Sequence, residues 1–265
     1  MEKAVELKAI GIYRSKQVHP YEAARQPRED RSHEGEITLE SGQGFEQALE
    51  GLEGFDRLWL IFQFHHNSHW NPKVMPPRGT DRKMGVFATR APYRPNALGL
   101  SCVRLQKIQE LTLTVSGADL LDGTPIFDLK PYVPEADSFP DAKIGWLEGI
   151  EQNRHRILWT VTSQEQLTWL QGKGLENLKD FLEQQLEFEP FDKDRKRVSQ
   201  TDQTNWVLAY RTWRAEFFLS GEKELTVTRL YSGYSADDLK SPEDKWADKE
   251  LHRKYQSVFG ESLSR

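Results

Sequence analysis

The sequence predicts a mainly β fold, with a large N-terminal domain built from strands and a smaller α+β domain at the C-terminal end. Two observations support this prediction. The first two thirds of the 265 residues alternate short β-favouring runs with turn residues and show few helical patterns. A longer amphipathic pattern then covers residues 163–186, which indicates a second domain. A composition of 37% hydrophobic and 29% charged residues is typical of a soluble globular protein.

The N-terminal domain is expected to consist mainly of strands. Residues 111–115 show the clearest strand pattern, because Leu111, Leu113 and Val115 alternate with two threonines, as in a strand with one face toward water. A helix is expected over residues 45–52. The expected strands cover residues 5–13, 36–40, 57–64, 86–89, 100–109 and 111–117.

The C-terminal domain is expected to begin with the helix over residues 163–186. A charged loop at 192–203 follows, and then strands at 206–219 and 224–230. The last segment is rich in charge, so a helix over residues 242–259 and partial disorder both fit it. We therefore expect a barrel or sheet domain over residues 1–150, a second domain over 151–235 and a charged tail over 236–265.

Composition and charge argue against several classes of protein. The formal net charge of -5 disfavours a protein that coats nucleic acid through bulk charge, so nucleic-acid contact must use local basic patches. The most apolar run, residues 58–64, is far shorter than the about 20 residues of a membrane-spanning helix. The first residues do not resemble a signal peptide, and the single cysteine, Cys102, lies in an apolar stretch. We expect a cytoplasmic protein with a buried thiol and no membrane contact.

A glycine pair offers a nucleotide-binding alternative. Gly42-Gln43-Gly44 lies between an expected strand and an expected helix, as a dinucleotide-binding turn does. Gln47 stands where that fingerprint requires its third glycine, so helix and strand could not approach closely. An ordinary turn is the simpler interpretation.

A histidine cluster offers a metal-binding alternative. His65, His66 and His69 could bind zinc together with Asp119 or Asp122. The segment has the pattern of a strand end followed by a loop, so His65 and His69 would not share a helix face. Ligand contact or hydrogen bonding by one histidine is the competing interpretation, and we expect no metal site.

Basic residues gather in two loops that could contact phosphates or could be solvated surface. The first cluster consists of Lys73, Arg78, Arg82, Lys83, Arg90 and Arg94. The second consists of Lys193, Arg195, Lys196 and Arg197, and precedes Trp206, Tyr210, Arg211, Trp213 and Arg214. Basic residues interleaved with aromatic ones suit RNA, although aromatic residues in a strand also form core.

Two stretches have the most distinctive residue patterns in the chain. The first is residues 85–101, GVFATRAPYRPNALGLS. The second runs from the Asp122-Gly123-Thr124-Pro125 turn through Lys130-Pro131-Tyr132, and places an acid and a base in an apolar run. Both stretches resemble the TsaA-like (TrmO) family of tRNA methyltransferases. Further matches at residues 10–15, 25–27, 51–55 and 58–65 extend the resemblance over about residues 5 to 140, and a weaker one covers Tyr210 to Arg214.

The resemblance implies a β-barrel that binds S-adenosylmethionine near the interface of a homodimer. It places cofactor contacts on Ala24, Arg25, Gln26, His65, His66, Arg90, Leu100, Asp122, Gly123, Thr124 and Pro125. Ala24 departs from the proline that the family commonly has there. Basic residues would then face the anticodon stem-loop of a tRNA, namely Arg78, Arg82, Arg94, Arg195, Lys196 and Arg197.

The activity implied by the resemblance is methylation at N6 of N6-threonylcarbamoyladenosine at position 37 of tRNA. Such a displacement at a sulfonium methyl depends largely on positioning two bound reactants. The acceptor nitrogen must lose a proton, and Asp122, Asp128 and Tyr132 are candidates among which the sequence does not choose a general base. A methyltransferase of the same fold with another acceptor and a non-catalytic RNA-binding module are the alternatives.

Overall fold

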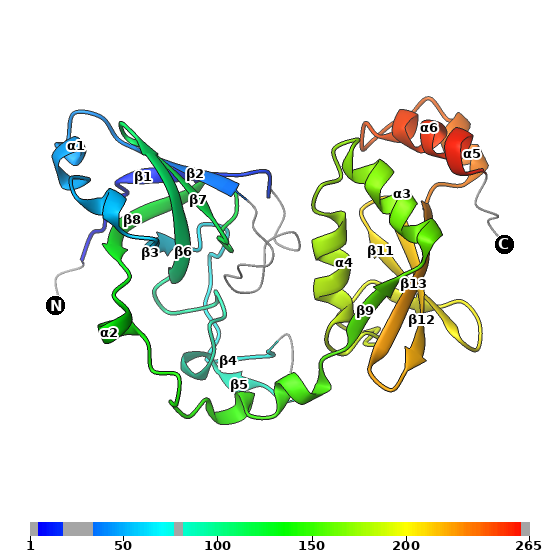
Figure 1. Cartoon of the computed structure of the whole chain (residues 1–265), viewed down its shortest axis with the longest axis horizontal. Coiled ribbons are helices and arrows are strands. Elements are labelled where there is room, and N and C mark those ends of the chain that lie inside the picture. Colours follow the sequence, from blue (N-terminus) through cyan, green and yellow to red (C-terminus); the bar gives the residue numbers. More distant parts are fainter. Residues whose placement is uncertain (1–4, 18–33, 77–81, 261–265) are drawn as a thin grey trace. The chain divides into compact units, whose positions relative to one another are not determined.

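The computed structural model describes residues 5–17, 34–76 and 82–260, and the chain divides into two compact units (Figure 1). The first unit ends at Trp146 and the second begins at Leu147. Each unit has its own cluster of buried hydrophobic side chains. The boundary falls close to residue 150, after the stretches that resemble the methyltransferase family.

Within the described residues, the first unit is a closed six-stranded barrel in the order β1-β2-β7-β6-β3-β8. All its strand pairs are antiparallel, and β1 pairs with both β2 and β8, so the barrel has no open edge. The strands are β1 (Gly11–Arg14), β2 (Glu34–Leu39), β3 (Arg57–Gln63), β6 (Leu98–Gln109), β7 (Thr112–Ser116) and β8 (Thr124–Pro131). The predicted mainly β fold with an N-terminal barrel is confirmed.

Alternating side chains along the strands build the barrel core. In β3, Leu58, Leu60 and Phe62 are buried, whereas Trp59 and Ile61 lie on the outer face and are half-buried. Gly99 of β6 faces inward against the Phe62 ring, and a Cβ atom at this position would lie 2.3 Å from it. Glycine is therefore required where β6 crosses this part of the core.

Short elements connect the barrel strands or lie between β8 and the sheet of the second unit. They are α1 (Phe45–Ala48), η1 (Leu52–Gly54), β4 (Lys73–Val74), β5 (Met84–Gly85), η2 (Val86–Ala88), α2 (Pro134–Asp137), η3 (Gly145–Leu147) and η4 (Ile150–Asn153). The strand predicted at residues 86–89 is wrong, because this segment forms the 3-10 turn η2, closed by the Thr89 hydroxyl donating to the Val86 carbonyl at 2.9 Å. The helix predicted at 45–52 is shorter than expected, because Gly51 takes a φ of 81° and starts a new turn.

The second unit contains a sheet of five strands among the described residues, in the order β10-β11-β12-β13-β9. Neighbours are antiparallel except β13 and β9, which run parallel. The strands are β9 (Arg156–Trp159), β10 (Val198–Gln200), β11 (Asn205–Tyr210), β12 (Trp213–Gly221) and β13 (Glu224–Ser232). The helices are α3 (Val161–Gln171), α4 (Leu178–Leu186), α5 (Ala236–Lys240) and α6 (Lys249–Phe259).

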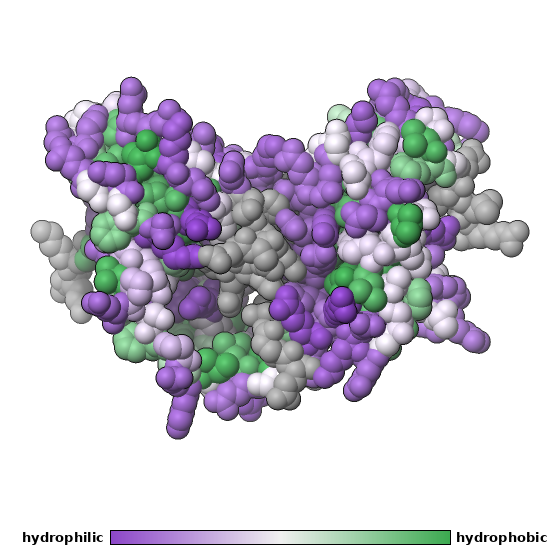
Figure 2. All heavy atoms as spheres, in the orientation of Figure 1, coloured by the Kyte–Doolittle hydropathy of each residue, from purple (hydrophilic) through white to green (hydrophobic). Residues whose placement is uncertain are grey.

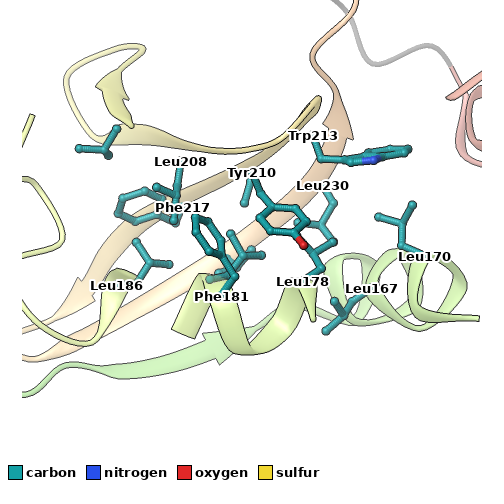
Figure 3. Close-up of a cluster of buried hydrophobic side chains, with 14 of the residues drawn as sticks. Leu167, Leu170, Leu178, Phe181, Leu186, Leu208, Tyr210, Trp213, Phe217 and Leu230 are labelled. Atoms are coloured by element: carbon teal, nitrogen blue, oxygen red, sulfur yellow. The ribbon is translucent and has the colours of Figure 1, made fainter. Parts of the chain in front are cut away.

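Helices α3 and α4 pack their apolar side chains against the sheet (Figure 3). The single helix predicted at 163–186 is two helices, because Gly172 ends the first and Gly174 turns the chain with a φ of 99°. The single strand predicted at 206–219 is a hairpin, with its turn at Arg211, whose φ is 49°. Leu167 and Leu170 of α3 and Phe181 of α4 join Tyr210 and Phe217 of the sheet in one core.

Helix α6 gives the charged tail a folded structure. It starts at Lys249, later than the predicted 242–259, and buries His252 and Tyr255. The Tyr255 hydroxyl donates to the Leu230 carbonyl at 2.6 Å, which attaches the helix to β13. No helix in the described part of the chain is long and apolar enough to cross a membrane. Hydrophilic residues cover much of the face seen in Figure 2, with smaller hydrophobic patches between them.

Candidate functional site

The strand registers bring the predicted cofactor residues to one end of the barrel. Tyr13, near the end of β1, pairs with Thr124 at the start of β8. Gln63, at the end of β3, pairs with Leu98 at the start of β6. Because β3 also pairs with β8, the segments after β1 and β3 meet the segments that lead into β6 and β8.

The turn from Asp122 to Gly123 is fixed to the segment that follows β1. The Gly123 amide donates to the Tyr13 carbonyl at 2.9 Å, and the Asp122 amide donates to the Gln17 carbonyl at 2.8 Å. Asp122 Oδ1 accepts a hydrogen bond from the Ser15 amide at 3.1 Å. Gly123 has a φ of 77°, which favours glycine at this position. The sequence motif therefore forms a rigid turn at the barrel end.

His65 lies against this turn. Thr124 Oγ1 donates to the Leu121 carbonyl at 2.7 Å and lies 3.4 Å from His65 Nδ1. The rings of His65 and His66 have centroids 3.9 Å apart. Burial and the neighbouring His66 lower the pKa of His65, so that the ring is neutral at neutral pH. A neutral imidazole here suits hydrogen bonding to a polar ligand.

Asp119 adds a carboxylate to the same end of the barrel. Ser101, which is 2% exposed on β6, donates from Oγ to Asp119 Oδ1 at 2.5 Å. Burial raises the pKa of Asp119 to about 6, while the Ser101 hydrogen bond and the positive charge of Arg90 act against that rise. Sequence reasoning considered Asp119 only as a metal ligand. Its pairing with Ser101 has no local sequence signal, because the two residues lie on different elements.

Leu100 and Ser101 occupy opposite faces of β6. The Leu100 side chain is 57% exposed on the outer face, where its cross-strand partner is Ile61. Only main-chain atoms of Leu100 are close to the inward-facing Ser101. This arrangement is compatible with cofactor contact through the main chain of Leu100. The exposed side chain of Leu100 is then available for a different contact.

Arg94 stabilises the loop that carries Arg90. Its Nη1 donates to the carbonyls of Val86 at 3.2 Å and Thr89 at 2.9 Å, and its guanidinium lies 5.8 Å from the Phe87 ring centroid. Arg94 is predicted to bind substrate, but in this structure its guanidinium already holds the loop together through these two carbonyls. Arg90 is exposed on this loop, and Arg82 is exposed in the segment between β4 and β5.

The basic loop of the second unit is partly structural. Lys196 is 8% exposed and donates from Nζ to the carbonyls of Gln185, at 2.6 Å, and Phe188. Arg195 forms ion pairs with Glu189 and Asp192. Arg197 is exposed and forms no ion pair with any described residue. Of the three predicted substrate contacts here, Arg197 is thus the most available.

Several predicted residues lie elsewhere. Ala24, Arg25, Gln26 and Arg78 lie outside the described residues. Two candidate bases are on β8 and just beyond it: Asp128 pairs with Lys130 at 3.2 Å, and the Tyr132 ring lies 5.9 Å from that of Trp59 on the outer face. Cys102 is only partly buried, and burial raises its pKa. In the ranges that the structure describes, no three His, Cys, Asp or Glu side chains are arranged to hold a metal ion.

Residues 12–138 match the family model described as the tRNA-methyltransferase O N-terminal domain. The chain is 34% identical over 219 residues to the tRNA (adenine(37)-N6)-methyltransferase of Escherichia coli, which covers 80% of this chain and 90% of the relative. It is 39% identical over 148 residues to a protein of Pyrococcus abyssi named as a probable S-adenosyl-L-methionine-binding protein, covering 56% of this chain and 77% of the relative.

A crystal structure of TrmO from Pseudomonas aeruginosa has a similar fold. It aligns with a TM-score of 0.60 and 28% sequence identity. The alignment covers 87% of this chain and 99% of that chain, so the similarity includes residues of both units.

Proposed function

The chain belongs to the tRNA-methyltransferase O family and is an S-adenosylmethionine-dependent methyltransferase for N6 of adenine 37 in tRNA; we propose that its acceptor is N6-threonylcarbamoyladenosine in the anticodon stem-loop. The E. coli relative, which matches over most of both chains, supports the reaction. The modified acceptor follows from the sequence resemblance. The structural observation that supports a ligand site for this reaction is the gathering of His65, Asp119 and the Asp122 turn at one barrel end.

The residues present fit a cofactor of this kind. Such a ligand is charged at its amino-acid end and neutral at its adenine end. Asp119 and Arg90 supply both signs of charge at the site, and form no ion pair with each other within the described residues. His65 and the main chain of the Asp122 turn supply uncharged hydrogen-bonding groups.

The chain's own contribution to the reaction is positioning. S-adenosylmethionine, when bound, supplies an electrophilic methyl group on its sulfonium. The Asp122-Gly123 turn is held on β1 by main-chain hydrogen bonds, so groups that contact ligand there need little reorganisation. His65, kept neutral, can orient a ligand group without adding charge to the site. The N6 proton must pass to a base or to water, and we assign no residue to that step.

Contact with tRNA is proposed for exposed basic residues of both units. Arg82 lies between β4 and β5, Arg90 in the loop between β5 and β6, and Arg197 in the loop before β10. Phosphate contacts of this kind position RNA without reading its sequence. The net charge of -5 makes such local clusters necessary.

A homodimer is proposed on the outer face of the barrel. Leu98 and Leu100 on β6 are 36% and 57% exposed, and the cross-strand partner of Leu100 on β3 is Ile61. Exposed apolar side chains that adjoin one another favour a protein interface. The expected result is the mass of two chains in light scattering, and a single-chain mass at micromolar concentration would contradict it.

The proposed acceptor is tested with tRNA that carries or lacks the threonylcarbamoyl group at adenosine 37. We expect the purified protein to transfer labelled methyl from S-adenosylmethionine only to the modified tRNA, with the methylated nucleoside identified by mass spectrometry. Equal methylation of both tRNAs would overturn the acceptor. Absence of both cofactor binding and methyl transfer would favour a non-catalytic RNA-binding module.

A further inference from the structure

Asp119 is a carboxylate at the barrel end whose contact with a particular group of the cofactor is not established by the family motifs. It lies three residues before Asp122 in the loop between β7 and β8, and Ser101 reaches it from β6. Within the described ranges, Ser101 is the one side chain that donates a hydrogen bond to it. The carboxylate is therefore held in place from one side and has capacity to accept further hydrogen bonds.

The described groups that act on Asp119 do not include a direct ion-pair partner for its charge. Tyr13 of β1 is buried, and its pKa is raised to about 12 mainly by that burial, with smaller contributions from Asp119 and Asp122, so it is neutral. Asp122 adds a second negative charge, and Arg90 is the positive group that acts on Asp119. No ion pair within 4 Å joins Asp119 to Arg90 or to another described residue. A partly buried carboxylate without a counter-ion is costly, and a cationic ligand would remove that cost.

Arg90 complements this arrangement. It is exposed and, among the described residues, has no carboxylate partner, although it is close enough to Asp119 to influence it electrostatically. A guanidinium and a carboxylate that influence each other electrostatically without forming an ion pair match a ligand that carries both charges. The amino-acid end of S-adenosylmethionine is such a zwitterion, because its ammonium and carboxylate lie on the same carbon atom.

We infer that Asp119, positioned by Ser101, binds the ammonium of the cofactor's amino-acid end while Arg90 binds its carboxylate. This assignment rests on the proposed function. It uses two observations together: Asp119 can accept further hydrogen bonds, and Arg90 has no carboxylate partner among the described residues. Charge-assisted hydrogen bonds are about twice as strong as neutral ones, so the pair would supply both affinity and orientation.

The test is calorimetric binding of three ligands to Asp119→Asn. S-adenosylmethionine and S-adenosylhomocysteine share the ammonium, and adenosine lacks the whole amino-acid end. We expect the affinities of the first two to fall alike, by about 10- to 100-fold, and that of adenosine to stay unchanged. Asp56→Asn, an exposed carboxylate of the same unit, is the control and should change none of them.

The pH dependence of binding provides the second measurement. Asp119 is ionised above pH of about 6, so the wild-type affinity for S-adenosylhomocysteine should fall as pH drops below that value. The fall should disappear in Asp119→Asn. In Ser101→Ala the fall in affinity should begin at a higher pH. The Ser101 hydrogen bond stabilises the charged carboxylate, so its loss raises the pKa of Asp119. If Asp119 had only a structural role, the affinity would not fall near pH 6 and Ser101→Ala would not shift the fall. The comparison of the wild type with Ser101→Ala still tests the assignment if Asp119→Asn does not fold.

Three outcomes would overturn the assignment. A loss of affinity for S-adenosylmethionine alone would place Asp119 beside the sulfonium, which S-adenosylhomocysteine and adenosine lack. Lost methyl transfer with unchanged binding of all three ligands would make it a base. A loss for adenosine as well would indicate a disrupted site. In contrast, failure of the wild-type protein to bind S-adenosylmethionine would count against the proposed function itself.

Discussion

Trp213 and His252 lie face to face in the second unit, with ring centroids 3.9 Å apart and planes inclined by 13°. His252 is fully buried, with Nδ1 2.7 Å from Ser232 Oγ and Nε2 3.0 Å from Thr212 Oγ1. These contacts attach helix α6 to the hairpin of β12 and β13. The sequence is compatible with either a helix or partial disorder in the charged tail. In the structure, helix α6 of that tail packs as an integral part of the second unit.

His252 should make the second unit sensitive to acid. Burial lowers its pKa from 6.5 to about 4, although Asp248 and Asp244 favour the charged form; Arg214 adds to the lowering. The unfolded chain thus binds the proton more readily than the folded one between these pH values. The free energy of unfolding should fall as pH drops from 6.5 to 4, by about 1.4 kcal/mol per unit of pKa difference.

Denaturant unfolding of the wild type and of His252→Gln between pH 4 and 7.5 measures this effect. The variant should be less stable at pH 7.5 but should show a flatter pH profile. His69→Gln, an exposed histidine of the barrel unit, should keep the wild-type profile. Parallel profiles for the wild type and His252→Gln would show that His252 is not the titrating group.

Gly99→Ala should destabilise the barrel. The added Cβ would lie 2.3 Å from the buried Phe62 ring, so ring or strand must move, which costs about 1–3 kcal/mol. Gly54→Ala is the control, because a Cβ there meets no atom within 4 Å. The midpoint of thermal unfolding distinguishes them, and equal midpoints would mean that the barrel has room at Gly99.

Adjacent basic residues of the second unit should have separable roles. Lys196→Ala leaves two carbonyls, of Gln185 and Phe188, without their ammonium donor, so the free energy of unfolding should fall by about 1–3 kcal/mol. Arg197→Ala should change stability by less than about 0.5 kcal/mol. It should instead weaken tRNA binding and reduce the salt dependence by about one phosphate contact. A stable Lys196→Ala with weakened tRNA binding would reverse the assignment.

The sequence predicts the barrel strands well where alternation is strict, as in Leu111 to Val115, and where the family stretches fix the order of segments. It fails at residues 86–89, because Val86, Phe87 and Thr89 favour strands while the Thr89 hydroxyl closes a 3-10 turn. The site is predicted in part. Local motifs identify the Asp122 turn, whereas the Ser101–Asp119 pair joins strand β6 to the loop between β7 and β8. Nothing in the basic run at 195–197 reveals that Lys196 is buried.

Gln17 should tolerate loss of its polar group. It is fully buried, and neither atom of its carboxamide has a hydrogen-bond partner in the described part of the chain, although its carbonyl accepts from the Asp122 amide. A buried amide without partners costs free energy, so Gln17→Leu should leave the ligand-free stability unchanged or raise it by about 1 kcal/mol. Gln166→Leu is the matched control: Gln166 is also buried, but its Oε1 accepts from the Leu230 amide at 2.7 Å, so its loss should cost about 1–3 kcal/mol. Scanning calorimetry without ligand measures both variants, and a loss at Gln17 as large as that at Gln166 would show that the Gln17 amide has a structural partner.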